Sequence, residues 1–87
     1  MTYLWIYMEV KIVLYGIAKD IIGTSNYLLP TEQGVTVKLL LEQLKVQFPK
    51  LKELNSLLVA INDEYAELDD IIKDNDEVIL VPPVSGG

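Results

Sequence analysis

TVKLLLEQLKVQFP, the stretch from Thr36 to Pro49, is the segment that decides the fold. Thr36 is a good N-cap, because its hydroxyl can accept a hydrogen bond from an unpaired N–H group at the start of a helix. Leu39 and Val46 lie off the apolar face of this helix, and Pro49 ends it because proline cannot continue the hydrogen-bond pattern. The apolar face that we expect to cover a sheet consists of Val37, Leu40, Leu41, Leu44 and Phe48.

Short segments on both sides of this helix have the composition of strands. The first and last of them are the most continuously apolar, as in the central strands of a sheet. Asn62 and Asp63 are typical turn residues between two strands, and Pro30 should end the strand before it. The predicted strands are residues 9–15, 25–29, 57–61, 64–66 and 77–81, with brief helical turns at 17–22 and 68–72.

This order of elements predicts an α+β domain, in which a mixed sheet of about five strands packs on one main helix. A chain of 87 residues is too short for two cores, so we expect one domain over residues 8–81. Its first and last strands should lie parallel and side by side at the centre of the sheet. Residues 82–87 would then form a tail that projects from the rim of the domain.

The first seven residues, MTYLWIY, form an apolar segment without a basic leading region. Glu9 and Lys11 follow closely, so the segment fits neither a secretion signal nor a membrane span. Translation could start at Met8, which would make residues 1–7 an optional extension. The alternative is that they add a piece of strand.

The composition excludes several classes of function. The net charge is −6, with seven lysines and no arginine, so the protein should repel nucleic acids and anionic membranes. The absence of cysteine and histidine removes disulfides, thiol nucleophiles, the usual zinc sites and the commonest general base. A free-standing enzyme would have to work with carboxylates, lysines and tyrosines, and we expect no metal site; the lack of cysteine is compatible with the cytoplasm.

An acidic run extends from Asp63 to Glu77, with Lys73 as the only positive charge in it. Its spacing does not match a calcium-binding loop, which needs alternating oxygen ligands, a central glycine and a terminal glutamate. We interpret the run as a solvated surface that faces a partner. A carboxylate pair for acid–base chemistry would need a pocket, for which a domain of this size has little room.

The C-terminal tail is the best candidate for chemistry. Two prolines are stiff and extended, and two terminal glycines lack Cβ atoms, so the backbone could thread a narrow channel and deliver its carboxylate to a buried site. The alternative is an ordinary chain end. The tail consists of Pro82, Pro83, Val84, Ser85, Gly86 and Gly87.

The sequence resembles the small subunit of molybdopterin synthase, a ubiquitin-like sulfur carrier. The resemblance runs from Met8 to Gly87 and includes LYGIAKDIIG at residues 14–23, LVAIN at 58–62 and, most specifically, the ending PPVSGG. It implies a β-grasp fold. A bare pair of terminal glycines would be shared by every ubiquitin-like protein.

The resemblance also implies a mechanism. A ubiquitin-activating-type adenylyltransferase would use ATP to convert the carboxylate of Gly87 into an acyl-adenylate, and sulfur would replace the adenylate to give a thiocarboxylate. The tail would then enter the large synthase subunit, in an expected heterotetramer, and give its sulfur to a cyclic pyranopterin precursor. The carrier itself would bind no cofactor, and the catalytic residues would lie on the large subunit.

Carried over by position, the docking surface of that family falls on Tyr15, Tyr65 and Val81. These residues could form an exposed apolar patch on the sheet face away from the helix, with Val78 and Leu80 turned inward. The alternative is that each packs in the core. Other functions also stay open: a thiamine-pathway sulfur carrier, a protein modifier joined through Gly87 to lysines, or a structural interaction domain with an idle tail.

Overall fold

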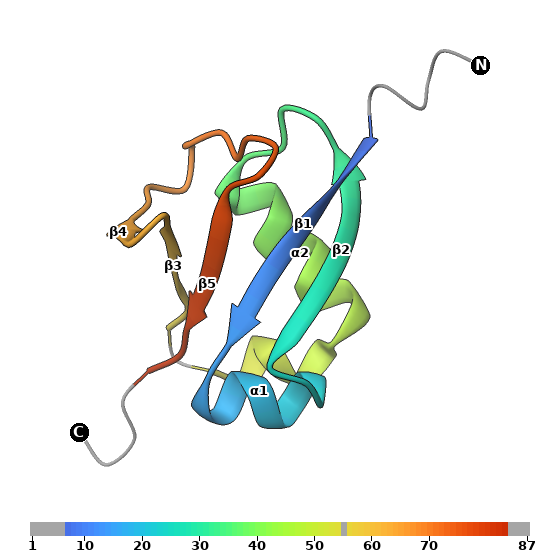
Figure 1. Ribbon diagram of the computed structural model, residues 1–87. Coiled ribbons are helices and arrows are strands. Elements are labelled where there is room, and N and C mark those ends of the chain that lie inside the picture. Colours follow the sequence, from blue (N-terminus) through green and yellow to red (C-terminus); the bar gives the residue numbers. More distant parts are fainter. Residues whose placement is uncertain (1–6, 55, 84–87) are drawn as a thin grey trace.

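The structure is a computed structural model, and it describes residues 7–54 and 56–83. Five strands form one sheet in the order β2-β1-β5-β3-β4, and helix α2 lies across one of its faces (Figure 1). The elements are β1 (Tyr7–Leu14), α1 (Gly16–Ile22), β2 (Asn26–Glu32), α2 (Val37–Gln47), the 3₁₀ helix η2 (Pro49–Glu53), β3 (Leu58–Ile61), β4 (Glu64–Tyr65) and β5 (Glu77–Val81).

The first and last strands lie next to each other inside the sheet, as predicted. β1 and β5 run parallel, in a register from Lys11 opposite Glu77 to Leu14 opposite Leu80 (Figure 1). The other pairs, β1 with β2, β3 with β5 and β3 with β4, are antiparallel. The sheet is therefore mixed, and with α2 on one face it has the predicted β-grasp arrangement.

Strand alternation divides the sheet into a buried face and an open face. In β5, Val78 and Leu80 are fully buried, whereas Ile79 and Val81 on the other face are half-buried. This confirms the predicted inward and outward positions of the last strand. β1 alternates in the same way, because successive side chains of a strand point to opposite faces. Its buried residues are Met8, Val10, Ile12 and Leu14.

The main helix forms as its sequence predicts. The hydroxyl of Thr36 accepts a hydrogen bond from the N–H of Leu39 at 3.2 Å, and Val37, Leu40, Leu41 and Leu44 are buried on the sheet. Leu39 and Val46 are exposed, in agreement with their place off the apolar face. α2 ends at Gln47, just before Phe48 and Pro49, as predicted, and Pro49 begins η2, a short 3₁₀ helix that the sequence analysis missed.

Two predicted elements were wrong. Pro30 does not end a strand, since β2 continues through it to Glu32. β2 pairs only with β1 and is an edge strand, so a missing N–H is tolerated there. Residues 68–72 do not form a helical turn. They run beside the start of α2, where the carbonyls of Leu68 and Asp70 accept hydrogen bonds from the first N–H groups of the helix.

Candidate docking face and tail base

The described part of the tail begins as a continuation of the domain. Val81 is the last residue of β5 and pairs with Leu58 of β3. Pro82 lies against the turn that begins α1, since a Cβ built on Gly16 would be 3.6 Å from its Cγ atom. Both Pro82 and Pro83 are half-buried. The sequence analysis expected a projecting tail that begins at residue 82; Pro82 and Pro83 are its described part, and residues 84–87, including Gly87, lie outside the described residues.

Tyr65 lies on the open face of the sheet. It pairs with Ala60 of β3, which in turn pairs with Ile79 of β5, and directly paired residues share a face. Its side chain is 71% exposed. The core position that the sequence left as an alternative is therefore excluded for this tyrosine.

Tyr15 continues the alternation of β1 by one residue. Its backbone is extended, with φ −131° and ψ 160°, and it follows Leu14, which is buried and pairs with Leu80. Tyr15 directly follows Leu14, and Val81 directly follows Leu80. Both residues therefore lie on the open face of the sheet. Tyr15 is 58% exposed, so it is not a core residue either.

Sequence reasoning missed the residues that connect these positions. Val13 pairs with Ile79, and Leu58 pairs with Val81, which extends apolar surface across three strands. The alternation in β3 and β5 could have revealed them, but only once the strand register was known. We call the resulting surface the docking face; it consists of Val13, Tyr15, Leu58, Tyr65, Ile79 and Val81.

An acidic hollow of about 490 Å³ lies beside the docking face. Tyr65 lines it together with Glu64, Asp69 and Asp70, and Lys73 is the only cation among its lining residues. A hollow of this charge next to an apolar surface suits a partner that presents a basic side chain beside apolar ones.

Part of the acidic run has a structural role that the sequence analysis did not predict. Asp76 accepts hydrogen bonds from the N–H of Lys73 at 2.8 Å and from the side-chain amide of Asn62 at 3.0 Å. Asp70 accepts one from the N–H of Glu67 at 2.9 Å. These carboxylates therefore hold turns in place. Among residues 7–54 and 56–83, no cluster of three or more potential metal ligands occurs.

Comparison with known proteins places the whole fold in one family. The ThiS family matches residues 12–87. A molybdopterin synthase sulfur carrier subunit from Arabidopsis thaliana is 35% identical over 81 residues, which cover 92% of this chain and 84% of that protein. The subunit of the same name from Dictyostelium discoideum is 36% identical over 84 residues, covering 91% and 96% of the two chains.

Solved structures agree with these matches. A candidate molybdopterin converting factor subunit 1 from Pyrococcus furiosus has a TM-score of 0.79 at 26% identity and covers 88% of this chain and 99% of its own. Small archaeal modifier protein 1 from Methanosarcina acetivorans scores 0.74 at 28% identity, covering 93% and 98%. A complex of subunits 1 and 2 of molybdopterin-converting factor from Helicobacter pylori scores 0.59 at 28% identity, covering 92% and 100%. By sequence and by fold, the chain belongs to the ThiS family, the family of the molybdopterin synthase sulfur carrier subunits that it matches.

Proposed function

We propose that this protein is the sulfur carrier subunit of molybdopterin synthase and that its sulfur is carried on Gly87. The observation that carries the proposal is the match to subunits of that name, at 35% identity over 92% of the chain. The family match extends to residue 87, so it includes the terminal glycine pair.

The proposed chemistry begins with activation of the carboxylate. A carboxylate oxygen of Gly87 attacks the α-phosphorus of ATP, and pyrophosphate leaves. Hydrosulfide, HS⁻, from the sulfur donor then attacks the acyl carbon; the bond to AMP breaks, AMP leaves as the better leaving group, a proton is lost and a thiocarboxylate remains. A ubiquitin-activating-type adenylyltransferase supplies ATP and the active site, in the cytoplasm. This carrier contributes the substrate carboxylate, because it has no cysteine or histidine to act as nucleophile or base.

The thiocarboxylate is then delivered to the large synthase subunit, and two carriers join two large subunits in a heterotetramer. The docking face supports this step, because it combines exposed tyrosines with aliphatic residues immediately before the tail. The Helicobacter pylori relative was solved as a complex of subunit 1 with subunit 2, which supports the choice of partner. Pro82 lies close to Gly16, next to the docking face from which the tail begins.

Intact mass spectrometry tests the proposal directly. The full chain is incubated with its activating enzyme, ATP and a sulfur donor. We expect a mass increase equal to the replacement of one oxygen by sulfur, located on the C-terminal residue. A chain without Gly87 is the matched control and should stay unmodified. An unchanged mass of the full chain, with an activating enzyme that forms adenylate on another carrier, would contradict the proposal.

A protein modifier is the second candidate function, because the small archaeal modifier from Methanosarcina acetivorans shares the fold at 28% identity. In that case the activated carboxylate of Gly87 would form an amide with a lysine of a target protein. Covalent conjugates that survive reducing and denaturing gels would favour this function. The sulfur carrier would instead show a thiocarboxylate and no such conjugates.

A further inference from the structure

The outer edge of β2 carries free backbone hydrogen-bonding groups. The N–H of Leu14 donates to the carbonyl of Ser25 at 2.9 Å, so in the regular antiparallel register the odd-numbered residues of β2 bond to β1. The even-numbered residues then direct their groups away from the sheet. Within the part of the chain that the structure describes, Leu28 and Pro30 make no backbone bond at this edge, while the carbonyl of Glu32 accepts one from Val35 at 3.3 Å.

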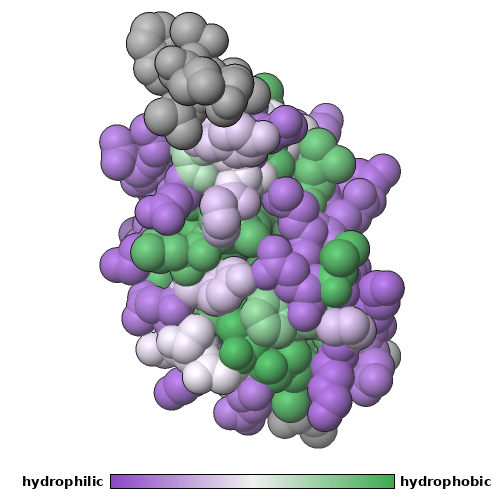
Figure 2. Space-filling view, turned by 90° about the vertical axis from the view of Figure 1, so that its right-hand side faces the viewer, coloured by the Kyte–Doolittle hydropathy of each residue, from purple (hydrophilic) through white to green (hydrophobic). Residues whose placement is uncertain are grey.

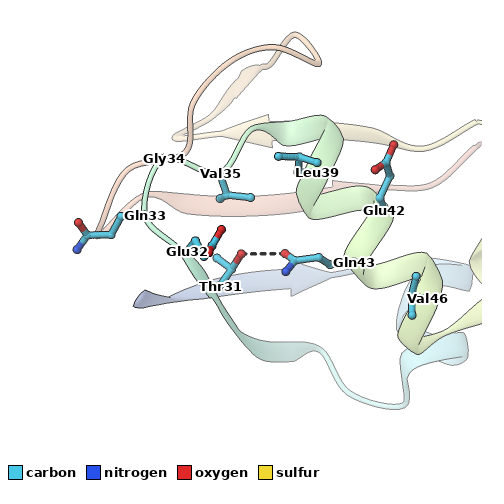
Figure 3. A pocket seen from close by; sticks show the side chains of 9 residues that line it. All are labelled: Thr31, Glu32, Gln33, Gly34, Val35, Leu39, Glu42, Gln43 and Val46. Atoms are coloured by element: carbon cyan, nitrogen blue, oxygen red, sulfur yellow. Dashed lines mark hydrogen bonds between the residues drawn. The ribbon is translucent and has the colours of Figure 1, made fainter. Parts of the chain in front are cut away.

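A hollow of about 340 Å³ lies next to this edge, between β2 and α2 (Figure 3). Leu39 and Val46 lie on one face of the helix, two turns apart, and flank the hollow with 50% and 74% of their side chains exposed. At the base of the hollow, the hydroxyl of Thr31 on β2 donates a hydrogen bond of 2.8 Å to the side-chain oxygen of Gln43 on α2. Thr31 is itself buried, and this hydrogen bond joins the two walls of the hollow.

The charged residues that line this hollow have one sign. Glu32 and Glu42 are the charged residues that line it, and both are exposed. Lys38 and Lys45 of α2 do not line the hollow. Figure 2 views this side of the molecule and shows apolar surface interspersed with hydrophilic surface. The site therefore offers apolar contacts and negative charge together.

Pro30 determines what can bind at this edge. It has no N–H, so it interrupts the row of donors on β2 and weakens pairing between two such edges. A second copy of this chain would bring a second Pro30 and a second set of acids to the contact. Pairing of the protein with itself is therefore disfavoured, and a shorter basic strand is favoured.

We propose that the edge of β2 and the adjacent hollow bind an extended peptide in which aliphatic and basic residues alternate. Bound as an additional strand, the peptide would receive hydrogen bonds from the N–H groups of Leu28 and Glu32 and donate to the carbonyls of Leu28 and Pro30. Its side chains alternate between the two faces of the sheet. The aliphatic ones contact Leu39 and Val46. The basic ones lie on the open face, where Glu32 and Glu9, which pairs with Pro30, are negative and Lys11, which pairs with Leu28, is positive.

This site is independent of the sulfur-carrier function. The sheet order places β2 at one edge and β4, which carries Tyr65, at the other. A peptide on β2 would therefore leave the docking face free. The same carrier could be held by one partner while its tail serves another.

Titration with a labelled peptide tests the inference. The probe is fluorescein-Lys-Val-Lys-Ile-Lys-Val-amide, and the control is fluorescein-Lys-Lys-Lys-Val-Ile-Val-amide, which has the same composition without alternation. We expect saturable binding of the probe, at least about fivefold tighter than that of the control, because only the alternating peptide can use both faces. Amide shifts of the full chain in NMR spectra should map to β2 and α2.

Two substitutions separate strand addition from unspecific attraction. Val46→Lys should weaken binding of the probe peptide about tenfold, which is the factor expected when the burial of one valine is lost. Leu68→Lys is the matched control, because it adds the same charge at an exposed leucine away from the hollow and should have a smaller effect. Pro30→Val restores the missing N–H and should tighten binding.

Each other outcome would overturn the inference. Equal affinity for both peptides, or equal effects of Val46→Lys and Leu68→Lys, would show that the peptide binds by charge attraction alone. Amide shifts confined to the docking face would place the peptide elsewhere. A dimer in light scattering that Val46→Lys dissociates would identify a second copy as the occupant. None of these readouts requires thiocarboxylate formation, so a negative result here would not contradict the proposed function.

Discussion

Asn62 and Glu77 are joined by two hydrogen bonds although they are 15 residues apart. The N–H of Asn62 donates to the carbonyl of Glu77 at 2.9 Å, and the N–H of Glu77 donates to the side-chain oxygen of Asn62 at 2.9 Å. The side-chain amide of Asn62 also donates to Asp76. One turn residue thus attaches the β3–β4 connection, which leads to Tyr65, to the start of the strand that ends at the tail.

Replacing Asn62 should destabilise the fold. Asn62→Ala removes two side-chain hydrogen bonds and puts alanine at a φ of +51°, where asparagine is better tolerated. We expect a loss of about 2 kcal/mol in the free energy of unfolding. Urea denaturation measures it. Asn26→Ala is the control, since Asn26 is exposed and bonds only to near neighbours; equal losses for the two variants would contradict the assigned role.

The bond between Thr31 and Gln43 should couple β2 to α2. Thr31→Val keeps the shape of a buried side chain but removes the donor to Gln43, and we expect a loss of about 1 kcal/mol in the free energy of unfolding. After that change, Gln43→Leu should cost less than it does in the parent protein, because its hydrogen bond is already absent. A double-mutant cycle from urea denaturation checks this. Strictly additive losses would show that the two side chains do not interact.

The docking face should contribute to partner binding without contributing much to stability. Tyr65→Ala removes a large exposed side chain, and we expect binding to the large synthase subunit to weaken about tenfold or more. Isothermal titration calorimetry with the thiocarboxylate-free carrier measures it.

Tyr7→Ala is the matched control for Tyr65→Ala. Tyr7 is also an exposed tyrosine, but it lies at the opposite end of β1 from Tyr15. Its replacement should leave the affinity nearly unchanged. If both variants bind like the parent protein, the docking face lies elsewhere; if Tyr65→Ala also unfolds at clearly lower urea, its effect is structural.

Removal of Gly87 should separate folding from function. The core is built from buried residues between Met8 and Leu80, so the free energy of unfolding should change by less than about 0.5 kcal/mol. Thiocarboxylate formation should be lost completely. Thermal unfolding followed by circular dichroism gives the first quantity, and intact mass gives the second. A large loss of stability would mean that the tail is part of the folded unit.

Local patterns in the sequence already determined much of the fold. The cap at Thr36, the apolar face of α2 and the inward Val78 and Leu80 were correctly predicted, because helical and strand periodicity record which face is buried. The exposure of Leu39 and Val46 followed from the same periodicity. The resemblance carried by the PPVSGG ending led to the right family, which the comparisons then established.

The tertiary structure decided what depends on residues distant in sequence. Pro30 could stay in a strand only because β2 is the edge of the sheet, and the sequence does not state which strand lies at an edge. Residues 68–72 form no helical turn; Leu68 and Asp69 form a hydrogen-bonded turn, and the carbonyls of Leu68 and Asp70 accept hydrogen bonds from the first N–H groups of α2. The link from Asn62 to Glu77, and the hollow where Thr31 meets Gln43, likewise arise from packing between separate elements. The periodicity of an element shows which of its faces is buried, whereas the elements that pack beside it depend on the whole fold.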